Sequence, residues 1–300
     1  MSRVGVVVLD FGRADDAARA AASARSGRAR VLIVENGAGP SAASDERHMR
    51  LAENLGFAGG MNAGLKQLLS EGCDRVLLLN NDAVLEPGCL GLLAEALDDA
   101  ALAAVGPVII REGDGRVESR GVSVNLRWGR VRLEGYGEAP RDERGVVPVA
   151  ALSGAVLMIH RRALERIGLL DEAYFFSFED IDWCLRAGEA GLGLRVVLGA
   201  RARHAGSRTI GLRHSDRFYY SARNHLRFLA RHPRPAPFPL WFRFGASAIL
   251  HLGHALTQGD TSRRHAASAV LAGFLDARRG RFGQRSPAPP PAHRNFRGPA

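Results

Sequence analysis

Four short apolar runs constrain the fold more than any other feature of this 300-residue sequence. Each run is rich in β-branched residues and almost continuously apolar, as expected for strands that are buried on both faces. The runs occupy residues 4–11, 29–36, 75–82 and 102–110. Segments with a helical pattern lie between them, at residues 14–25, 60–71 and 88–99. This alternation predicts an α/β protein with a mostly parallel, Rossmann-like sheet, flanking helices and ligands at the carboxyl ends of the strands.

The composition excludes several other classes of protein. Hydrophobic residues make up 46% and charged residues 24% of the chain, which is enough apolar material for a sizeable core. Cys73, Cys89 and Cys184 are odd in number, widely spaced and without a CxxC pair, so neither a disulfide framework nor a structural zinc site is expected. The apolar run near the N-terminus has no small-residue cleavage site after it. We therefore expect a first strand there instead of a signal peptide, and a cytoplasmic protein.

The net charge of +10 is concentrated in the last third of the chain. Residues 201–300 hold 18 of the 41 basic residues but only three of the 31 acidic ones. One interpretation is a solvated surface of biased composition. The other is attraction to an anionic membrane surface or to a phosphate-bearing acceptor. Charge alone is only a compositional hint of nucleic acid binding, and we do not expect a nucleic acid partner.

Polar side chains follow three of the predicted strands at the point where each strand ends. These residues are Asp10, Glu35, Asn36, Asn80, Asn81 and Asp82. Turn or cap chemistry explains a single residue of this kind. Three strand ends at one edge of a parallel sheet point instead to a shared ligand site. Asp82 is suited to a divalent cation there, with the asparagine side chains as neutral oxygen donors.

A glycine-rich stretch, ENLGFAGGMNAGL, extends from Glu53 to Leu65. Its four glycines predict a helix start at which the backbone approaches a flat or anionic ligand closely. A second glycine pattern, at residues 37–42, superficially fits the dinucleotide fingerprint. However, Pro40 and the polar residues after it do not continue as an apolar helix, and the turn after the first strand offers no phosphate site. A nicotinamide-dependent enzyme is therefore not expected.

Three carboxylates are crowded into the segment YFFSFEDIDWCLRAG, between a run of aromatic residues and an amphipathic helix. The helical spacing predicts that Ile181, Cys184, Leu185 and Gly188 face the core, and that Asp182 and Arg186 form an i, i+4 pair on another face. Glu179 and Asp180 are left at the helix N-terminus, where the helix dipole favours anionic groups. Simple helix capping is the alternative role for all three acids.

Five segments, in this order, closely resemble the family 2 inverting glycosyltransferases of bacteria, and in particular their rhamnosyltransferase-like branch. The segments are IVENG, ENLGFAGGMNAGL, LLLNNDAVLEPG, LSGAVLMIHRRALERIGLLDEAYFFSFEDIDWCLRAGEAGL and ARHAGS. The likeness covers roughly residues 3 to 230. It implies a GT-A fold, a nucleotide-sugar donor, a divalent metal (Mg²⁺ or Mn²⁺) and a single displacement that inverts the anomeric centre. It also implies a glycan or lipid-linked acceptor, with dTDP-rhamnose as the best candidate for the donor.

The resemblance implies roles for individual residues. Asp82 matches the last acid of the metal-binding DxD motif, in which Asn80 replaces the first acid, and His204 matches a histidine that completes the metal shell. Asp180, next to Glu179, matches the base that takes the proton from the acceptor hydroxyl. The donor-side residues are Asp10, Glu35, Asn36, Phe57, Gly59, Gly60, Asn62, Asn80 and Asn81. The acceptor-side residues are Asp182, Trp183 and Arg223. Because Asn80 weakens the metal motif, a catalytically inactive protein that binds sugar nucleotides remains the alternative.

The C-terminal part is predicted to consist of a helical extension and a tail. We expect a catalytic domain at residues 1–232, a helical extension at 233–282 and a proline-rich, disordered tail at 283–300. The apolar segment 237–256 is interrupted by Arg243, His251 and His254, which disfavours a full membrane span. An interfacial helix on the inner face of the cytoplasmic membrane and an ordinary buried helix both fit this segment.

Overall fold

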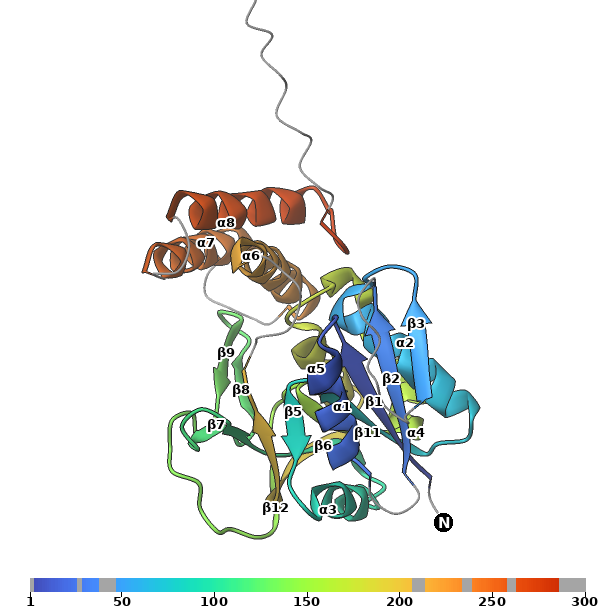
Figure 1. Cartoon of the computed structure of the whole chain (residues 1–300). Coiled ribbons are helices and arrows are strands. Elements are labelled where there is room, and N and C mark those ends of the chain that lie inside the picture. Colours follow the sequence, from blue (N-terminus) through green and yellow to red (C-terminus); the bar gives the residue numbers. More distant parts are fainter. Residues whose placement is uncertain are drawn as a thin grey trace, which may run out of the picture.

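Twelve strands are described, and ten of them form one mixed sheet at the centre of the molecule (Figure 1). The computed structural model describes residues 3–25, 29–37, 47–206, 214–233, 239–257 and 263–285. The strands are β1 (Val4–Asp10), β2 (Arg30–Asn36), β3 (Arg47–Leu51), β4 (Arg75–Asn80), β5 (Ala83–Leu85), β6 (Leu102–Arg111), β7 (Val117–Ser119), β8 (Val122–Asn125), β9 (Arg130–Leu133), β10 (Val146–Pro148), β11 (Val156–His160) and β12 (Gly193–His204). The sheet order is β10-β12-β6-β11-β4-β1-β2-β3, with β5 on β12 and β7 on β6, while β8 and β9 form a separate hairpin.

The register of the parallel strands brings the predicted polar strand ends to one edge. Strand β1 runs parallel to both β2 and β4, with Asp10 opposite Glu35 and Leu9 opposite Asn80. Strand β11 lies antiparallel between β4 and β6, and β12 runs parallel to β6. The four apolar runs of the sequence are β1, β2, β4 and β6, so the predicted α/β sheet is confirmed.

Helices cover both faces of the sheet and complete three layers. Helices α1 (Ala14–Ser23) and α3 (Cys89–Ala96) pack on one face, against side chains such as Val6 and Val8. Helices α2 (Gly56–Ser70), α4 (Arg161–Ile167) and α5 (Glu179–Glu189) pack on the other face, against side chains such as Val7 and Leu9. A short 3-10 helix, η1 (Glu172–Tyr174), precedes α5. Alternate residues of each strand therefore belong to two separate cores.

The glycines of α2 allow that helix to lie unusually close to the sheet. A Cβ atom on Gly60 would lie 2.4 Å from Cδ1 of Leu9, and one on Gly64 would lie 2.5 Å from Cγ1 of Val7. A Cβ atom on Gly59 would meet Cβ of Leu55 at 2.7 Å. In each case the close approach is to the chain's own residues. These glycines therefore have a packing role, whether or not the start of α2 also contacts a ligand, as the sequence predicts.

Replacing Gly64 with alanine is expected to destabilise the protein by about 1 to 3 kcal/mol, because the new methyl group overpacks the contact with β1. Gly91→Ala is the matched control, since Gly91 lies in α3 with no atom within 4 Å of its virtual Cβ. The control should gain up to about 1 kcal/mol from helix propensity. Urea denaturation of both variants measures the difference, and equal stabilities would contradict the packing role.

Helices α6 (His214–Arg231), α7 (Leu240–Thr257) and α8 (Arg263–Arg278) stack at the top of Figure 1 and share a third core. Phe218 and Leu226 of α6 meet Ala255 of α7 and Val270 and Phe274 of α8 in this core. The predicted C-terminal helical extension is confirmed. The predicted boundary at residue 232, however, separates α6 from the helices with which it shares its core. Of the predicted tail, residues 286–300 lie outside the described part of the chain.

Helix α5 follows its predicted pattern in part. Ile181 and Cys184 are buried, and Nε of Arg186 donates to Oδ2 of Asp182 at 2.9 Å, as expected for an i, i+4 pair. The prediction for Gly188 is wrong, because this residue is exposed and Ala187 is buried in its place. The buried stripe continues at a spacing of three residues in the last turn before α5 ends at Glu189.

Candidate active site

A cavity of about 380 Å³ opens at the carboxyl ends of β1 and β4 and beside the start of α5. Seven of the predicted site residues line it. They are Phe57, Asn80, Asn81, Asp82, Glu179, Asp180 and His204. These residues come from four separate stretches of the chain, so the fold, and not sequence proximity, brings them together. We call this cavity the cleft.

Asp180 lies at the start of α5 with its carboxylate fixed by two backbone amides. Oδ2 accepts a hydrogen bond from the N–H of Gly154 at 2.7 Å, and Oδ1 accepts one from the N–H of Ile181 at 2.8 Å. A Cβ atom on Gly154 would lie 3.1 Å from Oδ2, so a larger residue here would press on the carboxylate. Burial raises the pKa of Asp180 above its ordinary value, although the side chain remains partly exposed in the cleft. The geometry suits a carboxylate that accepts a proton.

Glu179 is the more deeply buried member of the pair, with 4% of its surface exposed. Burial and the neighbouring charge of Asp180 raise the pKa of Glu179 to about 8. Its Oε2 atom makes no hydrogen bond to any described residue. Glu179 is therefore the member of the pair that favours the protonated form, while two N–H groups stabilise Asp180 as an anion.

The raised pKa of Glu179 gives a testable pH dependence. The folded protein holds this proton more tightly than the unfolded chain, so the stabilising contribution is complete below the ordinary pKa of 4.5 and is lost as the pH rises through about 8. Glu179→Gln carries no titrating group. Between about pH 5 and pH 9 its Tm should therefore fall less than that of the wild type, as measured by circular dichroism. Glu165→Gln, at an exposed carboxylate, is the control and should follow the wild type.

Asp82 and His204 meet on the opposite side of the cleft. His204 ends β12 where this strand pairs with β5, and its Nε2 atom lies 3.2 Å from Oδ1 of Asp82. The other ring nitrogen, Nδ1, lies 2.9 Å from Oε2 of Glu118 on β7. Burial lowers the pKa of His204, but the two carboxylates outweigh this effect and raise the pKa to about 10. Glu118 thus turns the ring so that Nε2 faces Asp82.

Glu118 and the apolar wall of the cleft were not predicted from the sequence. Glu118 lies on a three-residue strand with no motif around it, and it reaches His204 only because β7 and β12 both pair with β6. Val131 and Leu133 of the β8-β9 hairpin form the apolar wall. The alternation of arginine and apolar residues at 130–133 indicates a short strand, but nothing in the sequence shows that Val131 and Leu133 face the cleft or that Glu118 reaches His204.

The side chains of Asp82 and His204 suit a divalent cation that displaces the proton on Nε2 of His204 and takes its remaining ligands from phosphate oxygens. In the part of the chain that the structure describes, no group of three or more His, Cys, Asp or Glu side chains is arranged to hold a metal ion. A cation at this position would therefore need oxygens from a bound diphosphate. Asp82 and His204 therefore fit the implied divalent metal only when a bound diphosphate supplies the other ligands.

Several residues predicted for the donor side instead support the cleft from behind. Asp10 is buried, and its Oδ1 atom accepts hydrogen bonds from the side chain of Asn81 at 3.0 Å and from the backbone of Arg13 at 2.8 Å. The side chain of Asn36 accepts from the N–H of Leu55 at 2.8 Å and donates to the carbonyl of Gly56 at 2.7 Å. These two residues therefore hold Asn81 and the start of α2 in place.

Glu35 and Asn62 also lie outside the lining of the cleft. The carboxylate of Glu35 is bound by Nε of Arg50 at 2.6 Å and lies 2.9 Å from Nδ1 of His48, both on β3. The side chain of Asn62 donates to the carbonyl of Leu170 at 2.9 Å and to Glu172 at 2.8 Å. Asn62 thus ties α2 to the segment that leads into η1.

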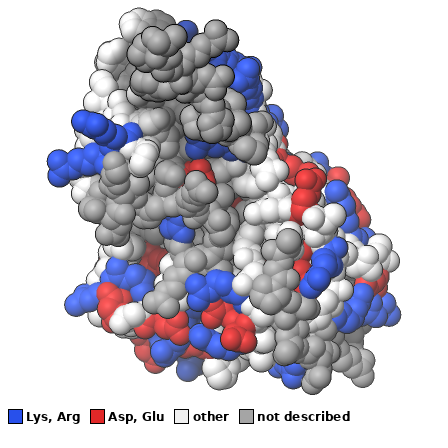
Figure 2. Space-filling model, turned by 45° about the horizontal axis from the view of Figure 1, so that its top comes forward, with Lys and Arg blue, Asp and Glu red and all other residues white. Residues whose placement is uncertain are grey.

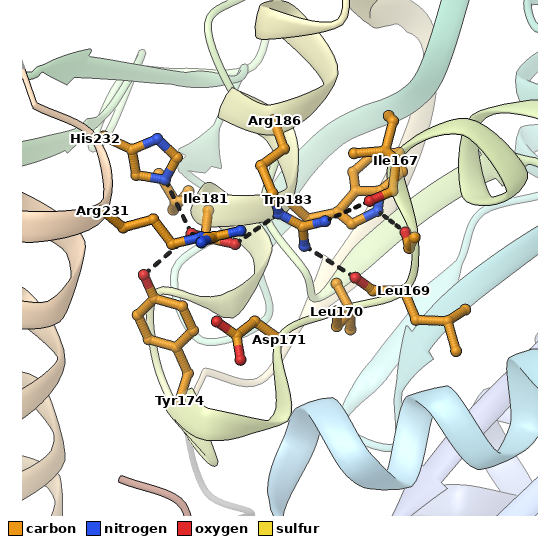
Figure 3. A network of polar contacts seen from close by, with 12 residues as sticks. Ile167, Leu169, Leu170, Asp171, Tyr174, Ile181, Trp183, Arg186, Arg231 and His232 are labelled. Carbon is orange, nitrogen blue, oxygen red and sulfur yellow. Dashed lines mark hydrogen bonds and ion pairs between the residues drawn. The ribbon is translucent and has the colours of Figure 1, made fainter. Parts of the chain in front are cut away.

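The residues predicted for the acceptor side are enclosed in the interior, which corrects that assignment. Asp182 is fully buried and accepts hydrogen bonds from Arg186 and His232, each at 2.9 Å, and from the hydroxyl of Tyr174 at 3.1 Å. Figure 3 shows these partners converging from η1, α5 and the end of α6. Burial would raise the pKa of Asp182, but the hydrogen bonds and positive charges of His232 and Arg186 lower it below its ordinary value. Asp182 is therefore an ionised structural link.

Trp183 and Arg223 are enclosed in the same way. Nε1 of Trp183 donates to the carbonyl of Gly168 at 2.9 Å. Arg223 is 1% exposed and donates to the carbonyl of Tyr174 at 2.8 Å. Neither side chain lines the cleft.

The sheet, its helical layers and a cleft at the strand ends define the protein as one with the GT-A fold of glycosyltransferases. The structure resembles that of GalNAc-T7 with UDP, GalNAc and Mn²⁺, with a TM-score of 0.64 and 13% sequence identity over 93% of this chain and 56% of that chain. It also resembles TarS from S. aureus, with a TM-score of 0.53 and 14% identity over 92% of this chain and 81% of that chain. At these identities the likeness shows the fold alone.

The chain belongs to glycosyltransferase family 2. The sequence model of "glycosyltransferase like family 2" matches residues 6–227. An N-acetylglucosaminyl-diphospho-decaprenol L-rhamnosyltransferase of Mycobacterium tuberculosis is 31% identical over 209 residues, 60% of this chain and 68% of the relative. The dTDP-rhamnosyl transferase RfbF of Shigella flexneri is 24% identical over 242 residues, 77% of each chain. The M. tuberculosis protein Rv1525 is 29% identical over 181 residues, and the match spans 59% of this chain but only 64% of that relative.

Proposed function

We propose that the protein transfers a sugar from a nucleotide-sugar donor to a hydroxyl of a lipid-linked or cell-envelope glycan, with inversion at the anomeric carbon. The observation that carries this proposal is the cleft, in which a fixed carboxylate, Asp180, lies opposite the pair of Asp82 and His204. Rhamnose from dTDP-rhamnose is the favoured donor sugar. Two relatives named as rhamnosyltransferases support this choice, and the name of one of them supports a lipid-linked acceptor.

The positions of Asp180 and Asp82 on opposite sides of the cleft suit a single-displacement reaction. The acceptor hydroxyl attacks the anomeric carbon while Asp180 takes its proton, and the bond from that carbon to the diphosphate oxygen breaks on the opposite face. A single displacement of this kind inverts the configuration. The amides of Gly154 and Ile181 hold the carboxylate of Asp180 in one orientation throughout. A divalent metal held by Asp82 and His204 would supply positive charge to the departing diphosphate.

A donor screen tests the proposed function without knowledge of the acceptor. The protein is incubated with dTDP-, UDP- and GDP-sugars and with Mn²⁺ or Mg²⁺, and release of the nucleoside diphosphate is measured. Slow hydrolysis of dTDP-rhamnose above that of the other donors is expected. Tight nucleotide binding without release from any donor would contradict the enzyme assignment and favour the inactive binding protein.

We further propose that donor binding depends on the metal. Isothermal titration with the nucleoside diphosphate is expected to show binding in the presence of Mn²⁺ and little or none with EDTA. Asp82→Asn should weaken the binding seen with Mn²⁺, because it removes the anionic ligand. Equal affinity with and without EDTA would overturn this part of the proposal.

We also propose that the helical unit rests on an anionic membrane, on the inner face of the cytoplasmic membrane. Ile249 and Trp241 of α7 are 74% and 73% exposed, and Leu271 and Leu275 of α8 are also exposed. Arg243, which interrupts the apolar run in the sequence, points inward and donates to the carbonyl of Leu126 at 2.6 Å. Among the described residues of α7, the exposed face therefore carries no Asp, Glu, Lys or Arg.

The positions of the basic side chains also support contact of the C-terminal helices with an anionic membrane. Exposed arginines lie at both ends of α8, at positions 263, 264, 278 and 279. Basic side chains spread over the upper part of Figure 2, while acidic side chains lie mainly below it. None of the helices in the described ranges is sufficiently long and apolar to span a bilayer. An apolar face between arginines is typical of a helix that lies in the membrane interface.

Sedimentation with vesicles tests the membrane proposal on the full chain. Binding should require anionic lipid and weaken as salt is added. Ile249→Glu should abolish binding, whereas Leu92→Glu, at an exposed leucine of α3, is the matched control and should bind normally. Truncation after residue 232 is unsuitable because it would expose the core side chains of α6. Protein that stays in the supernatant with anionic vesicles at low salt would contradict the proposal.

A further inference from the structure

The loop in front of Asp180 has an unusual backbone conformation. Phe175, Ser177 and Phe178 have φ angles of 61°, 73° and 78°, in the left-handed region that residues other than glycine rarely adopt. Phe178 directly precedes Glu179, the first residue of α5. Three such residues within four positions persist only when the surrounding structure holds them, and conformations of this kind concentrate at functional sites. We call residues 174–178 the catalytic loop.

Asn224 of α6 holds the carbonyl groups of this loop. Its side chain is fully buried, and Nδ2 lies 2.8 Å from the carbonyl of Tyr174, 2.6 Å from that of Phe176 and 2.9 Å from that of Ser177. Its Oδ1 atom accepts a hydrogen bond from Nε of Arg223 at 3.0 Å. This bond fixes the amide so that its two N–H donors face the loop.

Aromatic contacts with α6 hold the side chains of the same loop. The ring of Phe175 stacks on that of Tyr220, with ring centroids 5.1 Å apart, and the ring of Phe178 stacks on that of His225 at 5.6 Å. On the other side of the loop, the carbonyl of Phe175 accepts from the N–H of Phe57 at 2.7 Å. Phe57 lines the cleft near the start of α2. The loop is therefore fixed between α6 and the donor side of the cleft.

We propose that Asn224 is a positioning residue, which acts on the reaction by holding the catalytic loop so that the carboxylate of Asp180 faces the acceptor. This inference rests on the proposed function. Asn224 does not itself line the cleft, whereas Phe176 and Ser177, whose carbonyl groups it holds, do, so its effect passes through the loop. A displacement of the reacting groups by about 1 Å can cost about 10²-fold in rate. A loop without its central donor would allow displacements of this size.

A graded series of variants tests the proposal in the full chain. Asn224→Ala removes all three carbonyl contacts and is expected to lower kcat by about 10²-fold, with the KM for the donor within about threefold of wild type. Asn224→Gln keeps the amide donor on a longer side chain and should recover part of the loss. It also serves as the measurable variant if the alanine variant does not fold. Asp216→Asn is the control, since it weakens a different contact of the same helix, the hydrogen bond that Arg285 donates to Asp216 at 3.0 Å.

The pH profile separates positioning from simple instability. A loosened loop admits water to the buried carboxyl groups, so the acidic limb of the kcat profile should move to lower pH in the Asn224 variants. Loss of folded protein alone would scale kcat by the folded fraction, which circular dichroism measures at each pH, and would leave the midpoint of the acidic limb unchanged after this correction. A kcat within about threefold of wild type in Asn224→Ala, or a loss that only follows the folded fraction, would overturn the proposal. Absence of turnover in the wild type itself would instead refute the proposed function.

Discussion

Asp180→Asn is expected to lower the rate of sugar transfer by about 10²- to 10⁴-fold, which is the usual contribution of a general base. Asparagine keeps the size of the side chain, but its single oxygen can accept only one of the two hydrogen bonds that Gly154 and Ile181 donate to Oδ2 and Oδ1 of Asp180. It cannot take a proton from the acceptor hydroxyl. Donor affinity, measured by isothermal titration, should stay close to that of the wild type, so the effect belongs to kcat.

Asp142→Asn is the control for this experiment, because the side chain of Asp142 is 95% exposed and lies outside the cleft. It should transfer sugar at the wild-type rate. Glu179→Gln distinguishes the two neighbouring carboxyl groups. Near-normal transfer by Asp180→Asn, together with a large loss in Glu179→Gln, would move the role of the base to Glu179.

Asp182→Ala is expected to destabilise the fold by about 3 to 5 kcal/mol, the cost of breaking a buried ion pair from one side. The substitution leaves Arg186, His232 and the hydroxyl of Tyr174 without the carboxylate that they share in the interior. Urea denaturation gives the free energy of unfolding. Because the network joins α5 to the end of α6, the variant should also unfold at a lower temperature when followed by circular dichroism.

Glu189→Ala is the matched control, since Glu189 is the second partner of His232, at 3.2 Å, but its side chain is 53% exposed. Solvent screening limits such a pair to about 1 kcal/mol or less. If the two variants lose the same stability, burial of Asp182 is not the source of its effect.

The sequence predicted best those parts of the site that sit at strand ends. Asn80, Asn81 and Asp82 follow a buried strand, and the register of parallel strands then determines which other strand ends lie beside them. The same reasoning could not separate the residues that line the cleft from those that support it. Asp10 and Asn81 differ in this way although both end strands at one edge.

Glycines and buried acids account for most of the remaining differences. Glycine allows close approach of either a ligand or a neighbouring strand. The sequence could therefore not show that Gly60 and Gly64 face β1. Asp182 has the spacing of an exposed helix position. However, the end of α6 covers that face of α5, and His232, 50 residues further along the chain, bonds to Asp182. Such coverage depends on the path of the C-terminal helices, and local periodicity contains no information about that path.

Helix α6 belongs to two cores at once, and this has a consequence for exchange of parts between relatives. Its aromatic side chains pack with α7 and α8, while Asn224 and His232 reach the catalytic loop and Asp182. A chimera that took its last two helices from a relative would have to match the packing surface of α6. A chimera that also took α6 from the relative would have to match the catalytic loop and α5 of this protein. Modular recombination in this part of the chain therefore requires coordinated changes on both sides of the junction.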